Sequence, residues 1–335
     1  MTPAPLLPQH RDAFLQAHRE VFASTVDDDW YRWKSAGPGN PSLAMWVGVP
    51  GESALMAHCG GTARTLLDRG VRRQALQIGD VMVRKAWRSG VRRSGAFYRV
   101  SSAFYTQHLG AGRPFEWGFG FPSHRHMKLA VALGLLHDAG PMVSAVWPSA
   151  PVPPAPGSTV LDLGRSWALR PLHGLDAQRQ ALAAAWRRMR SDAAHWVLGE
   201  RSPQTVLWRH THKPTEPGRW TPQLWALSRT WGTDPVGVVV VGPGPTPAAA
   251  HWLDWVGPPR LLHLGLQAAR HAAAGAGCQE VHAWLSAGPW QQLGAGGTLC
   301  HAEAARIGIP AVSTLSAEEA SRRPWWFMGA DTDFL

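Results

Sequence analysis

The sequence contains little lysine and little cysteine, and it has no long apolar run. Only four of its 33 basic residues are lysines. The three cysteines, Cys59, Cys278 and Cys300, are widely spaced and form no Cys-x-x-Cys pair, which excludes a disulfide framework and a zinc site of that type. The longest apolar stretches, such as Val236 to Val241, fall far short of the roughly 20 residues of a membrane helix.

The N-terminus offers no targeting signal. Residues Met1 to Gln9 hold three prolines and lack the basic-then-apolar pattern of a secretory signal. A chain without a disulfide framework suits a reducing compartment. We therefore expect a soluble cytoplasmic protein with no membrane partner.

Length and composition predict a folded protein of two domains. The chain has 335 residues, against roughly 150 for an average domain, and its charged fraction of 17% is too low for a disordered chain. Five prolines between Pro148 and Gly157 exclude helix interior and central strand, so this stretch predicts a linker. We divide the chain into an N-terminal domain at 1–147, a linker at 148–158 and a C-terminal domain at 159–335.

Apolar periodicity predicts alternating helices and strands in the first domain. An aromatic and basic cluster, Trp30 to Lys34, leads to a Gly/Pro turn. The predicted elements are helices at Arg11 to Ala23, Ser94 to His108 and His124 to Leu133, and strands at Leu43 to Val49, Ala54 to Leu67, Gln74 to Val83, Phe115 to Phe121 and Met142 to Trp147.

The second domain repeats part of this pattern. Trp208-Arg209-His210, which precedes Pro214, echoes Trp33-Lys34-Ser35, which precedes Pro41, at a separation of 175 residues. An internal duplication is the economical explanation. The remaining predicted elements are helices at Gln178 to Arg190 and Leu264 to Ala274, and strands at Leu224 to Trp231, Pro235 to Val241 and Val281 to Leu285.

The segment from Asp80 to Phe97 combines the end of a strand, an arginine-rich loop and the start of a helix. Backbone N–H groups at a helix N-terminus bind phosphate, and a glycine lets the ligand approach closely. Arg88, Arg92 and Arg93 would add positive charge. The segment therefore predicts a pyrophosphate site, although an arginine run on a solvated loop has the same pattern.

These residues resemble the GNAT acyltransferase superfamily. Arg92 to Ala96 fits the Arg/Gln-x-x-Gly-x-Gly/Ala acyl-CoA loop, with Phe97 in the last small position. Trp117 to Pro122 is similar to a Tyr-Gly-Phe-Pro-Asn stretch, with Ser123 in place of the asparagine, and Trp325 to Asp333 is similar to a Trp-Tyr-Phe…Gly-Asp-Ser-Asp ending. The resemblance covers most of the chain but is specific only over Gly79 to Pro122 and the last eleven residues.

The resemblance implies an α/β (α+β) protein with two tandem GNAT-like domains, each a mixed, mostly antiparallel sheet flanked by helices. It implies that the first domain binds acyl-CoA, with acetyl-CoA as the expected co-substrate and no metal. The corresponding region of the second domain, Gly257 to Gly265, has prolines that remove N–H donors, so that domain would be degenerate. The implied cofactor-binding residues are Val81, Met82 and Val83, whose backbone would polarise the thioester carbonyl, and Arg92, Arg93, Ser94, Gly95, Ala96 and Phe97, whose N–H groups would hold the pyrophosphate.

Acyl transfer to an amine also needs a general base and a general acid. The candidate catalytic residues are Asp80, on the strand before the loop, and Glu116, on the aromatic strand. Each also has a structural interpretation, as a cap or ion-pair partner for Asp80 and as a surface charge for Glu116. Further candidates are His124, His126 and the carboxylate of Leu335 as bases, and Tyr98 and Tyr105 as acids.

Two histidine pairs have a spacing that metal ligands can adopt. His124-x-His126 and His210-x-His212 could each present two imidazoles on one face of a strand. No third ligand is spaced convincingly near either pair, so we predict no metal site.

We therefore predict an acyl-CoA-dependent N-acyltransferase, with acetyl as the expected group, that acts by direct transfer on a small-molecule amine. Two alternatives stay open. One is an aminoacyl-tRNA-dependent transferase like the Fem-type tandem GNAT proteins, which the net charge of +10 would suit. The other is a non-catalytic acyl-CoA-binding module. The sequence identifies neither the acceptor nor the oligomeric state.

Overall fold

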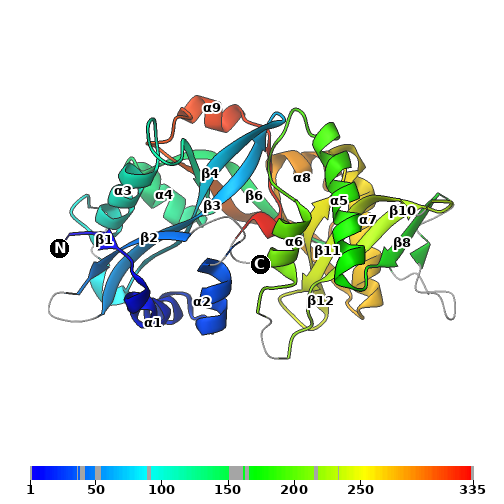
Figure 1. The fold of residues 1–335 in the computed structure, drawn as a ribbon, viewed down its shortest axis with the longest axis horizontal. Coiled ribbons are helices and arrows are strands. Elements are labelled where there is room, and N and C mark those ends of the chain that lie inside the picture. The colour runs from blue at the N-terminus through cyan, green and yellow to red at the C-terminus, as the bar shows by residue number, and fades with distance from the viewer. Residues whose placement is uncertain are drawn as a thin grey trace. The chain divides into compact units, whose positions relative to one another are not determined.

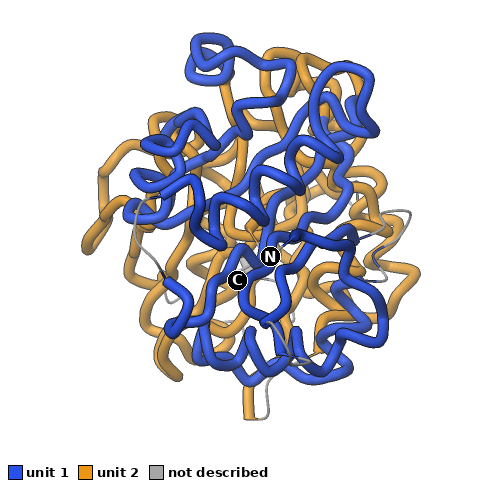
Figure 2. The backbone as a smooth tube through the Cα atoms, turned by 90° about the vertical axis from the view of Figure 1, so that its left-hand side faces the viewer, with its two compact units in different colours: residues 1–66, 73–140, 305–323 blue, residues 67–72, 141–304, 324–335 orange. Residues whose placement is uncertain are grey.

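The computed structural model describes residues 2–35, 37, 42–49, 54–88, 92–150, 161–162, 166–214, 218–232 and 234–332. The chain forms two compact units, which Figure 2 colours separately. In the described part of the chain, none of the helices combines the length and apolarity that crossing a bilayer requires. The first unit comprises residues 1–66, 73–140 and 305–323, and the second comprises residues 67–72, 141–304 and 324–335.

These units cross the predicted domain boundary. The first unit ends at Gly140 instead of residue 147, and it takes in residues 305–323 from near the end of the chain. The physical reason is strand pairing, because β14 (Cys300–Pro310) pairs with β5 (Trp117–Gly120) through Gly308 and Gly120. The predicted linker lies mostly outside the described residues, which omit 151–160.

The first unit is a mixed sheet with helices on both faces (Figure 1). Its strands follow the order β1-β2-β3-β4-β5-β14; the pairs β1/β2, β2/β3 and β5/β14 are antiparallel, and β4/β5 is parallel. Besides β5 and β14, its elements are β1 Ala4–Pro5, α1 Arg11–Phe22, α2 Asp28–Ser35, β2 Ser42–Gly48, β3 Leu55–Asp68, β4 Val71–Val83, α3 Ala96–His108, α4 His124–Ala132, the start of β6 Leu136–Pro148, and α9 Ala317–Arg322.

Alternation along β2 assigns the helices to opposite faces of this sheet. Met45 and Val47 belong to a core cluster that contains residues of α3 and α4. Trp46, between them, packs against a second cluster, which contains Phe14 of α1 and Met82 of β4. Because successive side chains of a strand point to opposite faces, α1 and α2 cover one face and α3 and α4 the other.

The second unit is also a mixed, mostly antiparallel sheet with packed helices. Its strands follow the order β6-β13-β12-β11-β10-β8-β7, in which only β12/β13 is parallel, and β15 pairs with β9. Its elements are the end of β6, β7 Leu161–Asp162, β8 Trp167–Pro171, α5 Leu175–Asp192, β9 Val197–Gly199, α6 Pro203–His210, β10 Gln223–Arg229, β11 Pro235–Pro243, β12 Ala249–Val256, α7 Leu262–Gly275, β13 Glu280–Ser286, α8 Ala287–Leu293 and β15 Trp325–Trp326.

The two units repeat the same order of elements, which supports the predicted duplication. In each, a strand leads into a helix and then into a parallel neighbour: β4-α3-β5 in the first unit and β12-α7-β13 in the second. Helix α6 begins and ends 175 residues after α2, so the two Trp-basic clusters occupy the same last turn of equivalent helices. The predicted helices and strands were found in both halves, with ends shifted by a few residues.

Candidate functional site

The N-terminus of α3 fits a phosphate group. Gly95 is the N-cap residue, and in the described residues no side chain caps this end of the helix. The first turn contains no acidic residue, and Arg92 and Arg93 before it are exposed. Open N–H groups, the positive end of the helix dipole and two guanidinium groups together favour an anion at this position.

Strand β4 extends past its neighbour just before this loop. The parallel pairing of β4 with β5 runs from Ala75 opposite Trp117 to Ile78 opposite Gly120. Strand β4 then continues to Val83, so residues 79–83 lie beyond that register. These residues include the three backbone positions predicted to contact a thioester, and the chain runs from them to the start of α3.

Asp80 lies at an irregular point of this extension. Its φ is +51°, an angle that side-chain-bearing residues seldom adopt. Its carboxylate accepts hydrogen bonds from Lys34 of α2, with Nζ 2.7 Å from Oδ2 and 2.8 Å from Oδ1. His18 Nε2 of α1 lies 3.5 Å from Oδ1. The strained backbone thus directs a carboxylate toward the face covered by α1 and α2.

The surroundings of Asp80 keep it ionised. Burial by itself would raise the pKa of this carboxyl, but attraction to Lys34, followed by the interactions with His18 and His58, outweighs burial and holds the pKa below its usual range. Asp80 is therefore a carboxylate at neutral pH. Such a group binds an ammonium ion well and is a weak acceptor of its proton.

His58 of β3 completes this group. Its Nδ1 lies 2.7 Å from the backbone carbonyl of Asp80, so Nδ1 carries the proton and Nε2 is the acceptor nitrogen. The side chain is 2% exposed, and burial, with a contribution from the charge of Lys34, lowers the pKa of His58 to about 4. His58 is therefore neutral at pH 7, with Nε2 as a hydrogen-bond acceptor.

Asp80, Lys34 and His58 line a cavity of about 100 Å³. Apolar side chains and hydroxyl groups both line it. The other lining residues are Leu6, Phe14, Trp30, Tyr31, Ser35, Ser42, Leu43, Ala44, Gly60, Gly61 and Thr62.

Glu116 lies elsewhere in the first unit. Its side chain is 61% exposed and pairs with Arg73 at 3.7 Å. The register of β4 with β5 places it beside residue 74, six residues before Asp80, which corresponds to roughly 20 Å along a strand. The structure does not bring the two predicted carboxylates together.

The other predicted acid–base residues are also dispersed. The ring centroids of His126 and Phe97 lie 5.0 Å apart, and burial lowers the pKa of His126. Tyr98 lies under the guanidinium of Arg93 at 5.9 Å, and burial raises the pKa of Tyr105. Leu335 is outside the described residues. Within the residues that the structure describes, no three histidine, cysteine, aspartate or glutamate side chains are grouped as metal ligands.

Sequence reasoning missed three residues that surround Asp80: His18, Lys34 and His58. The Trp30 to Lys34 cluster was noted, but its residues form helix α2 instead of leading directly into a turn. His58 sits in a strand whose residues are almost all buried. A lone histidine in such a strand was the available signal, because buried imidazoles need a polar partner.

In the second unit, a carboxylate and an indole ring lie beside the start of α7. Asp192 accepts hydrogen bonds from the backbone N–H and the guanidinium of Arg260, which places a carboxylate where a phosphate would bind. The indole of Trp255 is fully buried, and a Cβ on Gly257 or Gly265 would collide with it at 2.4 Å or 2.9 Å. An anion and an indole ring therefore occupy the region that is open in the first unit.

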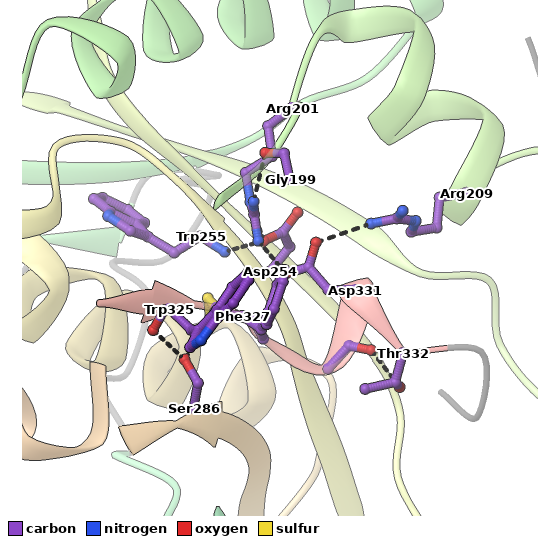
Figure 3. Close-up of polar contacts among 12 residues, drawn as sticks. Gly199, Arg201, Arg209, Asp254, Trp255, Ser286, Trp325, Phe327, Asp331 and Thr332 are labelled. Carbon is purple, nitrogen blue, oxygen red and sulfur yellow. Dashed lines mark hydrogen bonds and ion pairs between the residues drawn. The ribbon is translucent and has the colours of Figure 1, made fainter. Parts of the chain in front are cut away.

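A buried ion-pair network lies in the second unit near the end of β12 (Figure 3). Arg201 donates to Asp254 Oδ1 at 2.8 Å and to Asp331 Oδ2 at 2.5 Å. Arg209 of α6, the counterpart of Lys34, lies 3.6 Å from Asp331 Oδ1. Ser286 also donates a hydrogen bond to the Trp325 carbonyl, so residues near the end of the chain pack into the second unit.

Low pH should destabilise the protein partly through His58. The pKa of His58 is about 4 in the folded chain, below the unfolded value of about 6.5, so the unfolded chain binds its proton first as the pH falls. Its contribution to stability is present above about pH 6.5 and is lost as the pH falls toward 4. We expect the free energy of unfolding, measured with urea, to fall between pH 7.5 and pH 4.5 by roughly 2–3 kcal/mol more in wild type than in His58→Gln. His173→Gln, at an exposed histidine, should lose as much as wild type, and equal losses in all three proteins would contradict the prediction.

Comparisons with solved structures identify the fold. A probable N-acyltransferase from Enterococcus faecalis is 10% identical, with a TM-score of 0.62 over 92% of this chain and 71% of that one. A GCN5-related N-acetyltransferase from Anabaena variabilis is 13% identical, with a TM-score of 0.60 over 93% and 72%. A tandem GNAT protein from the clavulanic acid biosynthesis pathway is 13% identical, with a TM-score of 0.54 over 92% and 98%. No family model and no curated protein matches the sequence. The chain thus has the predicted tandem GNAT-like fold.

Proposed function

We propose that the chain is an acyl-CoA-dependent N-acyltransferase, and that its first unit transfers an acetyl group from acetyl-CoA to a small amine. One observation carries the proposal. Strand β4 presents Asp80 to the cavity through its irregular backbone, and its end leads to the open N-terminus of α3. The carboxylate that would bind an amine and the N–H groups that would bind a pyrophosphate therefore lie on the same segment of the chain, between Asp80 and the start of α3.

The cofactor fits the first unit. The backbone from Arg92 to Phe97 would hold the pyrophosphate, because it offers uncapped N–H groups and no acidic side chain. The backbone of Val81 to Val83 would polarise the acyl carbonyl, because these residues lie beyond the pairing of β4 with β5. Acetyl-CoA supplies the activated acyl group as a thioester when bound.

Asp80 and His58 have different roles toward the nitrogen of the acceptor. Asp80 binds and orients the ammonium form of the acceptor, since its low pKa makes it a strong anion and a weak base. His58 Nε2, which is unprotonated at neutral pH, accepts a hydrogen bond from the acceptor nitrogen, and the proton that this nitrogen loses passes to solvent. The nitrogen then forms its bond to the acyl carbon, the carbon–sulfur bond breaks, and the CoA thiolate leaves and gains a proton.

Isothermal titration with acetyl-CoA tests this function, and we expect one site per full-length chain. The first unit has the open helix N-terminus, while in the second Asp192 and Trp255 occupy the equivalent region. Acetyl-CoA should also support acetylation of an amine.

Other outcomes are equally clear. Two sites per chain would contradict the degenerate interpretation of the second unit. Absence of binding would overturn the proposal, and transfer only from aminoacyl-tRNA would establish the tRNA-dependent alternative. One CoA site without transfer to any amine would leave a non-catalytic binding module.

A further inference from the structure

The cavity of the first unit is balanced in charge. Among the described residues that line it, Asp80 and Lys34 are charged at neutral pH, and His58, with a pKa of about 4, is neutral. Lys34 Nζ is within 2.8 Å of both carboxylate oxygens of Asp80. The two side chains are only 13% and 15% exposed, so solvent screens them weakly.

A simple amine fits such a cavity poorly. At neutral pH an aliphatic amine arrives as an ammonium ion, which would place two cations on one carboxylate. Removing an unbalanced charge from water is strongly unfavourable in a site of low exposure. An acceptor with an anionic group of its own avoids this imbalance, because that group can pair with Lys34 while the ammonium pairs with Asp80.

We propose that the acceptor is a small zwitterionic amine, of the α-amino acid class, held by Lys34 through its carboxylate and by Asp80 through its ammonium group. This inference rests on the proposed function, because it assigns the substrate class of the same site. Lysine suits the exchange: its ammonium sits on a flexible stem, so Nζ can move from Asp80 to an incoming carboxylate.

The hydroxyl groups of the cavity support an anion. Burial raises the pKa of Tyr31, so its hydroxyl keeps its proton and can donate a hydrogen bond. Ser42 and Thr62 also line the cavity, where Ser42 Oγ donates to the Lys34 backbone carbonyl at 3.1 Å and lies 3.3 Å from Thr62 Oγ1. A carboxylate placed near Lys34 thus has the Tyr31 hydroxyl as a neutral donor besides the ammonium group.

The volume and walls limit the side chain of the acceptor. At about 12 Å³ for each water-sized position, 100 Å³ holds roughly eight to ten non-hydrogen atoms, which matches an amino acid of small or medium size. Phe14, Trp30 and Leu43 form apolar walls. Such walls favour an aliphatic side chain over a charged one.

Transfer also changes the charge in a direction that favours release. The ammonium group loses a proton, its nitrogen forms the amide bond, and the carbon–sulfur bond of the thioester breaks, so the products are an N-acyl amino acid, CoA and one proton. The amide no longer attracts Asp80, and the product keeps a carboxylate that Asp80 repels. Lys34 can then return to Asp80.

The test compares acceptors that differ only in the carboxylate, with acetyl-CoA as donor and the full-length protein. The pairs are alanine with alaninamide, and leucine with leucinamide and 3-methylbutylamine. We expect kcat/KM for the amino acid to exceed that for its partners without a carboxylate by at least about 100-fold. Lys34→Met, which keeps the length of the side chain without its charge, should reduce this preference below tenfold, and Lys34→Arg should retain it.

Calorimetry with acetyl-CoA on the same samples distinguishes failure of the proposed acyltransferase function from failure of the zwitterionic-acceptor inference. If acetyl-CoA does not bind, the proposed function itself fails. If acetyl-CoA binds and the wild-type protein acetylates amino-acid amides, alkylamines or aniline as well as it acetylates amino acids, the zwitterion inference is wrong. It is also wrong if acetyl-CoA binds and the protein acetylates no amino acid. An unchanged preference in folded Lys34→Met would overturn the role of Lys34.

Discussion

Replacing Gly95 with aspartate should abolish acetyl-CoA binding while leaving the protein folded. Gly95 has φ −72° and ψ 155°, which aspartate adopts readily, and aspartate is among the preferred N-cap residues. The new carboxylate would cap α3 and place a negative charge where the pyrophosphate binds. Repulsion between unit charges about 4 Å apart amounts to about 4 kcal/mol near a protein surface, so we expect at least about a 100-fold loss of affinity.

Two further variants separate charge from size at this position. Gly95→Asn offers a similar cap without the charge, and Gly95→Ala adds only a methyl group at a buried residue. Both should bind acetyl-CoA more tightly than Gly95→Asp, and thermal unfolding should show Gly95→Asp to be at least as stable as Gly95→Ala. Wild-type affinity in Gly95→Asp would show that the pyrophosphate does not bind at α3.

Replacing Asp80 with asparagine should reduce turnover by about 100-fold or more, the cost of a misplaced acceptor, and leave acetyl-CoA affinity within about threefold of wild type. Asparagine keeps the shape of the side chain but cannot form the ion pair that orients the acceptor. Steady-state acetylation measures the first effect and calorimetry the second. Glu116→Gln is the matched control, since Glu116 is exposed and outside the cavity, and it should keep full activity.

The variant needs a control for folding, because Asp80→Asn leaves the largely buried ammonium of Lys34 without its counter-charge. The double variant Lys34→Met/Asp80→Asn removes both charges and should regain stability without regaining activity. Full activity in Asp80→Asn, or loss of activity in Glu116→Gln, would contradict the assignment of Asp80.

Local patterns predicted most secondary structure because they reflect local physics. Alternation in β4 and helical spacing in α3 are properties of consecutive residues, and the glycine before α3 marks its N-cap. Helix α2 was missed because its eight residues are too short to show a clear period and none of them is buried. Its counterpart α6, 175 residues later, was missed as well, although Ser202 and Pro203 at its start are residue types that favour a helix N-terminus.

By itself the sequence determined many of the elements, their duplication and the arginine-rich start of α3 at which we propose that phosphate binds, since these depend on residues close together in the chain. Only the tertiary structure decided that Lys34 pairs with Asp80 across 46 residues, and that Glu116 does not join them. It also decided that residues 305–323 belong to the first unit. These outcomes depend on strand register and on the path of the chain between distant strands, and a shift of one residue reverses the face on which a side chain lies.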